Sequence, residues 1–305
     1  MQLYVIFLGT GGSWPTVKRN VSAIAVKRGG EILLFDCGEG TQRQIQRSGL
    51  SYMQIKSIFI SHFHGDHFLG LPGLIQTMQL NDRKEPLTIY GPRGISRIVE
   101  IVKNLGYFRP SYEIVGKDVD EGDEIRFNGY SVRPFRVEHN VPALGYVLEE
   151  DMRPGRFNKK KALELGIPEG PLFGRLQRGE SIKLKDGRVI TPDMVLGPPR
   201  PGRKVVYTGD TKPCNKVVEF ARNADLLIHD ATFLSDLEDV AIEYGHSTAR
   251  QAAEIAKEAN VDRLVLTHIS PRYLDDRAIE EEAKNIFENS IVARDFLKLE
   301  VKLRK

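Results

Sequence analysis

Short apolar runs rich in β-branched residues alternate with amphipathic segments along most of this 305-residue chain. The runs at residues 3–8, 55–60 and 264–267 are typical of buried strands. Residues 94–106 and 247–260 instead have the apolar spacing of helices. Because strands and helices alternate in both halves of the chain, the sequence predicts an α/β fold.

Residues 151–202 interrupt this alternation, since they are rich in proline, glycine and basic residues. Residues 153–188 alone carry ten Lys or Arg against four Asp or Glu, whereas the whole chain has a net charge of only +3. We therefore expect a single domain over residues 1–305 with a protruding basic insertion at 151–202. Such a concentration of charge suits a polyanion partner, although a solvated loop with surplus lysines has the same composition.

The apolar and cysteine content excludes several classes of protein. The longest apolar runs are too short to cross a membrane, and the N-terminus lacks the basic region and cleavage site of a signal peptide. The two cysteines, Cys37 and Cys214, are too few for a disulfide framework or a thiolate zinc site. We expect a cytoplasmic protein, and any metal ion should be held by imidazole and carboxylate groups.

A cluster of histidines and one aspartate, HFHGDH, follows one of the predicted strands. It holds three of the seven histidines in the chain. His62 and His64 are two residues apart in an extended segment, so they point to the same side and can bind one metal ion. The turn at Gly65 then allows Asp66 and His67 to face a second ion beside the first.

Three further candidate ligands follow the carboxyl ends of predicted strands: His139, Asp210 and His268. Because functional groups of an open α/β sheet gather at such ends, we expect these residues to join the histidine cluster. The donors suffice for two zinc ions per chain, with Mn²⁺ as a substitute. The ligands form two sets of three with one shared carboxylate: His62, His64 and His139; Asp66, His67 and His268; and Asp210.

The histidine cluster resembles the HxHxDH signature of the metallo-β-lactamase superfamily, which implies an αββα sandwich with a dinuclear zinc site. Other stretches are similar to one branch of that superfamily, the tRNA 3′-processing endonucleases. These stretches are PTVKRN at residues 15–20, FDCGEGTQRQ at 35–44 and GHST at 245–248. The basic insertion at 151–202 resembles the flexible arm with which that family grips tRNA.

The resemblance implies a zinc-dependent endoribonuclease that cuts precursor tRNA on the 3′ side of the acceptor stem. The products would be a tRNA with a 3′-hydroxyl and a trailer with a 5′-phosphate. Asp66 would position the attacking water and could act as base, whereas His246 would be the general acid. Asp230 would orient His246, although the family more often has the longer Glu at this position. The family is commonly homodimeric, with one subunit's arm gripping the tRNA that the other subunit cuts.

Several residues are candidates for contact with the RNA. A basic loop after the first strand can reach phosphates, although an ordinary solvated turn has the same composition. Trp14, just before that loop, could stack on a base or pack beneath the loop. We expect Asp36 to be a hydrogen-bonding residue near the site and not a ligand. The expected substrate contacts are Lys18, Arg19, Asn20, Thr248, Arg175 and Arg178.

Two alternative functions stay open from the sequence. A phosphodiesterase or arylsulfatase of the same superfamily would use the same ligands on small esters, but a small substrate needs no basic insertion. An RNA-binding or scaffold protein could carry an inactive metal site, but nothing would then require all seven ligands.

Overall fold

The computed structural model describes residues 1–304, which divide into two compact units. The larger unit comprises Met1–Leu148 and Arg203–Lys302. The smaller unit comprises Glu149–Gly202 and the last residues from Leu303 onward. The basic insertion expected at 151–202 lies within the smaller unit.

Two seven-stranded mixed sheets form the larger unit, in the orders β16-β1-β2-β3-β4-β5-β6 and β15-β14-β13-β12-β9-β8-β7. Strands β3 to β6 run parallel to one another, as do β12 to β15, whereas β1 with β2 and β2 with β3 form antiparallel pairs. The first sheet consists of Leu3–Gly9 (β1), Ala23–Arg28 (β2), Glu31–Phe35 (β3), Ile55–Phe59 (β4), Leu87–Gly91 (β5), Ile114–Asp118 (β6) and Lys298–Glu300 (β16). The second consists of Ile125–Phe127 (β7), Tyr130–Arg136 (β8), Leu144–Glu150 (β9), Lys204–Tyr207 (β12), Leu226–Asp230 (β13), Leu264–Thr267 (β14) and Ser290–Val292 (β15).

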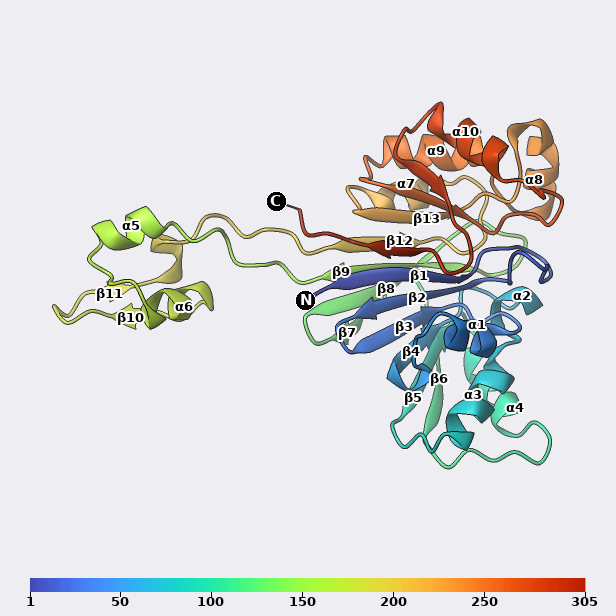
Figure 1. Cartoon of the computed structure of the whole chain (residues 1–305), viewed down its shortest axis with the longest axis horizontal. Helices are drawn as coiled ribbons and strands as arrows, with labels where there is room; N and C mark the ends of the chain where they lie inside the picture. The colour runs from blue at the N-terminus through green and yellow to red at the C-terminus, as the bar shows by residue number, and fades with distance from the viewer. Residues whose placement is uncertain (305) are drawn as a thin grey trace. The chain divides into compact units, whose positions relative to one another are not determined.

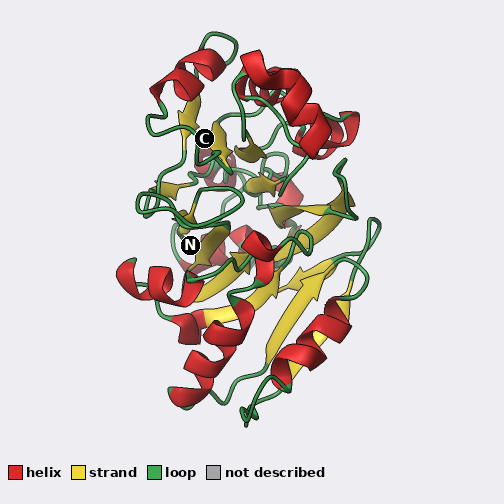
Figure 2. Ribbon diagram, turned by 90° about the vertical axis from the view of Figure 1, so that its right-hand side faces the viewer, coloured by secondary structure: helices red, strands yellow, loops and turns green. Residues whose placement is uncertain are grey.

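Helices cover the outer face of each sheet (Figures 1 and 2). Beside the first sheet lie Thr41–Arg47 (α1), Gly65–Phe68 (α2), Leu71–Leu80 (α3) and Ile95–Lys103 (α4). Beside the second lie Asn215–Ala221 (α7), Glu238–Tyr244 (α8), Ala249–Glu258 (α9) and Arg277–Lys284 (α10). Short 3₁₀ helices occur at Tyr52–Gln54, Pro192–Met194 and Ser235–Leu237. Across residues 1–304, every helix is too short or too polar to span a membrane.

Three apolar clusters hold these layers together. One lies between the sheets, where the rings of Phe35 and Phe59 stack with their centroids 5.2 Å apart. The others lie between each sheet and its helices, as with Val99 of α4 on one side and Ala253 of α9 on the other. Burial of both faces explains why strands such as β1 and β14 are largely apolar, whereas the edge strands β7 and β16 are partly exposed. The αββα order implied by the resemblance is thus confirmed.

The smaller unit has a core of its own, although its elements are short. It contains Lys159–Glu164 (α5), Pro171–Gln177 (α6), Ile182–Lys183 (β10) and Val189–Ile190 (β11). The two strands pair as a hairpin. Its buried apolar residues are Ala162, Ile167, Leu176, Ile182, Ile190 and Val195. The insertion is therefore a small folded unit with basic residues on its surface.

Candidate metal centre

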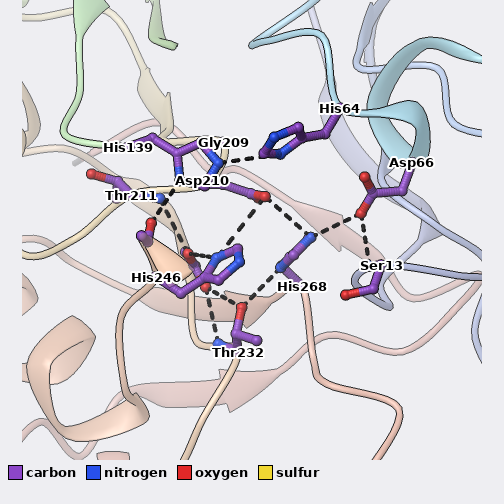
Figure 3. Close-up of polar contacts among 12 residues, drawn as sticks. Ser13, His64, Asp66, His139, Gly209, Asp210, Thr211, Thr232, His246 and His268 are labelled. Atoms are coloured by element: carbon purple, nitrogen blue, oxygen red, sulfur yellow. Dashed lines mark hydrogen bonds and ion pairs between the residues drawn. The ribbon is translucent and has the colours of Figure 1, made fainter. Parts of the chain in front are cut away.

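The candidate ligands are brought together from both sheets (Figure 3). His62, His139, Asp210 and His268 each lie within three residues of the carboxyl end of β4, β8, β12 or β14. The ligand atoms within 4.8 Å of one another form three groups: His62, His64, His139 and Asp210; Asp66, His67 and His268; and Asp210, Asp230, His246 and His268. The first two groups contain the same residues as the two sets expected from the sequence.

The first group places three imidazoles around one point. His64 Nδ1 lies 3.0 Å from His62 Nε2 and 3.3 Å from His139 Nε2. Burial lowers the pKa of all three histidines, which keeps the rings neutral. Neutral rings this close together offer lone pairs that can converge on a single cation.

Asp210 connects the two groups. Its Oδ2 lies 3.2 Å from His67 Nε2, 3.3 Å from His268 Nε2 and 3.6 Å from His62 Nε2. Asp66 completes the second group, with Oδ2 3.2 Å from His268 Nε2. One carboxylate oxygen of Asp210 thus faces nitrogen atoms of both groups, as a bridging ligand would.

Two buried atoms of this centre have no hydrogen-bond partner among the described residues, as expected for atoms that bind a divalent metal ion. His67 Nε2 and Asp210 Oδ1 are buried atoms without a hydrogen-bond partner among residues 1–304. Buried polar atoms rarely lack hydrogen-bond partners. Two such atoms in one cluster therefore indicate that a bound group normally contacts them. Imidazole nitrogens with carboxylate oxygens form the donor set typical of catalytic zinc. Burial alone would lower the pKa of His67, but the carboxylates of Asp210, Asp36 and Asp66 raise it. A metal ion held at Nε2 would take the place of a proton there.

Asp36 orients His67 from the side opposite the cluster. Its carboxylate, fully buried, accepts hydrogen bonds from Ser61 N, Ser61 Oγ and Tyr207 Oη at 2.6–2.8 Å. It also accepts from His67 Nδ1 at 2.7 Å, which leaves Nε2 directed at the cluster. Asp36 has φ 56°, a left-handed conformation that a buried carboxylate keeps only when its surroundings enforce it. The expectation that Asp36 is a hydrogen-bonding residue near the site is confirmed.

The other histidine rings are held in the same way. His62 Nδ1 donates to Ser61 Oγ at 3.0 Å, and His139 Nδ1 donates to the carbonyl oxygen of Gly245 at 2.7 Å. Thr232 Oγ1, which donates to Asp230, accepts from His268 Nδ1 at 2.8 Å. Each of these bonds leaves Nε2 free to bind a metal ion. The sequence analysis missed Thr232, although a polar residue two positions after a buried strand was the available signal.

His246 and Asp230 form a hydrogen-bonded pair beside the ligands. Asp230 Oδ2 accepts from His246 Nδ1 at 2.8 Å and from Thr211 N at 3.1 Å, while Oδ1 accepts from Thr232. The aspartate therefore reaches His246 despite being one methylene shorter than glutamate. Burial alone would lower the pKa of His246, but the Asp230 carboxylate raises it to about 9. The His246 ring also stacks on His268, with centroids 5.0 Å apart.

The loop after β1 is fixed directly to the centre. Ser13, with φ 67°, donates its main-chain N–H to Asp66 Oδ2 at 2.7 Å. Gly12 packs against the His268 ring so closely that an added Cβ would lie 2.5 Å from it. The loop therefore cannot move away without disturbing Asp66. No side-chain pattern signals a main-chain contact of this kind, which explains why the sequence analysis missed Ser13.

The basic residues of this loop divide into exposed and engaged side chains. Lys18 is exposed, and its Nζ donates to the carbonyl oxygen of Leu274 at 3.0 Å. Arg19 points inward and pairs with Asp276 at 2.6 Å. Asn20 donates its main-chain N–H to Asp295 at 2.8 Å. The geometry favours Lys18 as a substrate contact, whereas Arg19 and Asn20 hold the base of the loop.

Three other expected substrate contacts already have partners. Thr248 is buried at the start of α9, where its hydroxyl accepts from Gln251 N in a capping box. Arg175 and Arg178 both pair with Glu180, at 2.8 and 3.2 Å. For Thr248 the placement favours a helix-capping role over the expected contact with RNA.

Two family models match parts of the chain. The model described as "Anti-Pycsar protein Apyc1" matches residues 3–100, and the "Beta-lactamase superfamily domain" matches residues 187–269. Whole-chain relatives are more informative. The chain is 54% identical over 303 residues to ribonuclease Z of Methanosarcina acetivorans, with 99% of each chain covered. It is 53% identical to ribonuclease Z of Archaeoglobus fulgidus, with 99% of this chain and 98% of that protein covered.

Two solved structures superpose on this chain over almost its whole length. Human tRNase Z, short form, superposes with a TM-score of 0.72 at 29% identity, covering 98% of this chain and 100% of the human chain. A diphosphatase from the PhnP family has a TM-score of 0.66 at 19% identity, covering 99% of this chain and 98% of that chain. The second likeness shows the fold alone.

Proposed function

The chain belongs to the ribonuclease Z family, and from this premise we propose that it is the endoribonuclease that removes the 3′ trailer from precursor tRNA. Cleavage leaves a 3′-hydroxyl on the tRNA and a 5′-phosphate on the trailer. The observation that carries this function is the 54% identity to a ribonuclease Z over 99% of both chains. The small-ester alternative is not favoured, because the diphosphatase likeness extends to the fold only.

Two zinc ions per chain, with Mn²⁺ as a substitute, are part of the proposal. Asp210 supports a dinuclear arrangement, because its Oδ2 lies 3.2 Å from His67 Nε2 and 3.6 Å from His62 Nε2. When bound, the metal ions supply a nucleophilic water at neutral pH and offset the negative charge of the phosphate. The residues that would hold them are His62, His64 and His139; Asp66, His67 and His268; and Asp210.

Asp66 is the residue we assign to positioning the attacking water. Its Oδ2 accepts the Ser13 N–H at 2.7 Å and faces His268 Nε2 at 3.2 Å, so the carboxylate has a fixed orientation. A carboxylate held in this way can accept a hydrogen bond from a water molecule and take its proton.

His246 is the residue we assign as general acid. Its Nδ1 donates to Asp230, which leaves Nε2 as the atom able to donate to the leaving oxygen. When the bond between phosphorus and O3′ breaks, O3′ takes its electron pair and receives this proton. The carboxylate of Asp230, held by Thr211 and Thr232, keeps the ring in one orientation.

The tRNA grip is assigned to the basic insertion at 151–202. Arg156, Lys161, Lys183 and Lys185 have no ion-pair partner among residues 1–304, so their charge is available to phosphates. Following the resemblance, we propose a homodimer in which the insertion of one subunit grips the tRNA cut by the other. A cytoplasmic location is consistent with two cysteines that are both free thiols.

The test is cleavage of a 3′-extended tRNA transcript by the purified protein with Zn²⁺ or Mn²⁺. We expect a tRNA-sized product with a 3′-hydroxyl, identified by enzymatic ligation, and a trailer with a 5′-phosphate. Hydrolysis of small phosphodiesters without cleavage of the transcript would instead support the small-ester phosphodiesterase. Light scattering of the same preparation tests the dimer, and a monomer that cleaves at full rate would contradict it.

A further inference from the structure

A groove next to the loop after β1 carries two arginines, Arg43 and Arg47, that have not yet been given a role. It has a volume of about 630 Å³ and lies between the loop of residues 15–20 and helix α1. Lys18 stands on the loop side of the groove. Arg43 and Arg47 stand on the helix side, four residues apart and therefore on the same face of α1.

The two arginines are available for a ligand. Both are exposed, and no carboxylate among residues 1–304 forms an ion pair with either guanidinium. Arg47 is nevertheless held in place, because it donates to Gln44 Oε1 at 3.1 Å and lies 4.7 Å above the centre of the Phe296 ring. Arg19 on the same loop differs, since its charge is already offset by Asp276.

The acidic groups of the groove leave its net charge positive. Asp295 is engaged by three donors, Thr10 Oγ1, Asn20 N and Gln44 Nε2, each at 2.8 Å. Glu39 is the other carboxylate among the described lining residues, and it is exposed. Three cations on two facing walls therefore outnumber the acids, an arrangement that suits a phosphate backbone.

Both walls of the groove are attached to Asp66. From the loop side, Ser13 N donates to Asp66 Oδ2 at 2.7 Å. From the helix side, Gly38 in the turn before α1 packs so tightly that an added Cβ would lie 2.3 Å from the Asp66 carbonyl oxygen. The two segments that border the groove therefore both lead, within a few residues along the chain, to a contact with Asp66 of the metal centre.

The chemistry of the reaction decides which RNA strand lies on the Asp66 side. His246 and Asp66 lie on different sides of His268 (Figure 3): His246 stacks on the face of its ring, whereas Asp66 contacts the Nε2 edge at 3.2 Å. O3′ belongs to the tRNA and takes its proton from His246, so the tRNA lies on the His246 side. The trailer keeps the phosphate and leaves the centre on the Asp66 side.

We propose that this groove holds the backbone of the 3′ trailer, and that Arg43 and Arg47 bind its phosphates. The proposal rests on the proposed function, because it uses the position of the leaving oxygen. The same phosphate chemistry is present in the strand of the acceptor stem, so the experiment has to separate the two sources.

The experiment compares one tRNA carrying either a long trailer or a trailer of a single nucleotide. The double variant Arg43→Gln, Arg47→Gln should lower kcat/KM on the long-trailer precursor by roughly tenfold, because two solvent-exposed cations that contact phosphates are lost. On this substrate the dependence of log kcat/KM on log salt should become shallower by about 1.4, at roughly 0.7 per phosphate contact with a single strand. The single-nucleotide trailer offers no such phosphates, so its loss should be much smaller.

Arg97→Gln on α4 is the matched control, because it removes an exposed helical arginine outside the groove. It should leave the ratio between the two precursors at its wild-type value. Equal losses on both precursors in the double variant would overturn the proposal, since the arginines would then contact the tRNA itself. An unchanged ratio without any loss would also overturn it. Thermal unfolding and metal content show whether the variant is folded.

Binding of an isolated trailer oligonucleotide, followed by fluorescence anisotropy, gives a readout that does not depend on cleavage. The double variant should bind it more weakly, whereas Glu39→Gln should bind it more tightly. A wild-type protein that cleaves neither precursor would refute the proposed function. The proposal for the groove would still be tested by binding of the trailer oligonucleotide. Equal affinity of the wild type and the double variant for this oligonucleotide would overturn it.

Discussion

The metal centre and the basic insertion are both rich in charged residues, but they hold them in opposite ways. In the centre a carboxylate such as Asp230 is buried and accepts four hydrogen bonds. In the insertion, pairs such as Lys159 with Glu169 and Arg188 with Asp186 are exposed to solvent. A buried polar group without a partner is costly, so the centre has one arrangement, whereas exposed ion pairs contribute little and rearrange easily.

The largest effect should come from removing the metal ions, which breaks the centre and leaves the insertion intact. Wild-type protein should contain about two zinc ions per chain, as its ligand set implies. His64→Ala and Asp210→Ala should each lower the metal content measured by atomic emission and abolish cleavage of precursor tRNA. A preparation that is active after exhaustive chelation would contradict a metal-dependent centre.

The next effect separates catalysis from metal binding within the centre. His246→Ala should lower kcat on precursor tRNA by roughly 10²–10⁴, the usual cost of losing a positioned general acid, while the metal content stays at its wild-type value. Asp230→Asn should cause a smaller loss, because the ring is retained but less well oriented. Because His246 lies within 4.8 Å of potential ligand atoms, loss of zinc in His246→Ala would identify it as a ligand instead.

The third effect tests the basic insertion, the second of the two regions compared. Replacing residues 153–200 by a short Gly/Ser linker should severely weaken binding and cleavage of precursor tRNA, and should reduce the salt dependence of binding. Hydrolysis of bis(p-nitrophenyl) phosphate should largely survive, because a small diester needs the centre alone. Similar losses on both substrates would place the insertion within the catalytic unit, and unchanged tRNA cleavage would remove its assignment as the tRNA grip.

A smaller effect distinguishes paired from unpaired cations in the insertion. Arg156 and Lys161 line one cavity of about 420 Å³ and have no ion-pair partner among the described residues, whereas Arg175 and Arg178 share Glu180. Replacing the first two by Gln should flatten the salt dependence of tRNA binding by about 1.8, at roughly 0.9 per duplex phosphate. The same change at Arg175 and Arg178 should have less effect. A larger effect at Arg175 and Arg178 than at Arg156 and Lys161 would instead identify the former pair as the principal tRNA contacts.

The smallest effect concerns Thr248, which belongs to neither region if its role is to cap α9. Thr248→Val should lower the free energy of unfolding by about 1 kcal/mol, the typical cost of losing such a cap. KM for precursor tRNA should stay within twofold or so of wild type, since the side chain is buried. A raised KM at unchanged stability would instead support the substrate contact expected from the sequence.

The fold class could be predicted because strands and helices have distinct apolar spacing. The gathering of candidate ligands could be predicted because they follow the carboxyl ends of the predicted strands. The buried strand β14 is apolar apart from its last residue, Thr267, and His268 directly follows it. The role of Arg19 could not be predicted, because its partner Asp276 is 257 residues away and charge alone does not reveal a partner. The short elements of the insertion were missed for a related reason: strands of two residues are too short to show a period.

The hydrogen bonds of Asp36 have a consequence for how the protein matures. They join β3 to Tyr207, 171 residues later, while the proposed ligands extend from His62 to His268. Contacts this distant in sequence form late in folding, because the long loops between them must close first. During synthesis, the second ligand group stays incomplete until residue 268 has left the ribosome. The second ligand group can therefore be completed only after nearly the whole chain has been synthesised, and a nascent chain truncated before residue 268 would carry the first histidine cluster without that group.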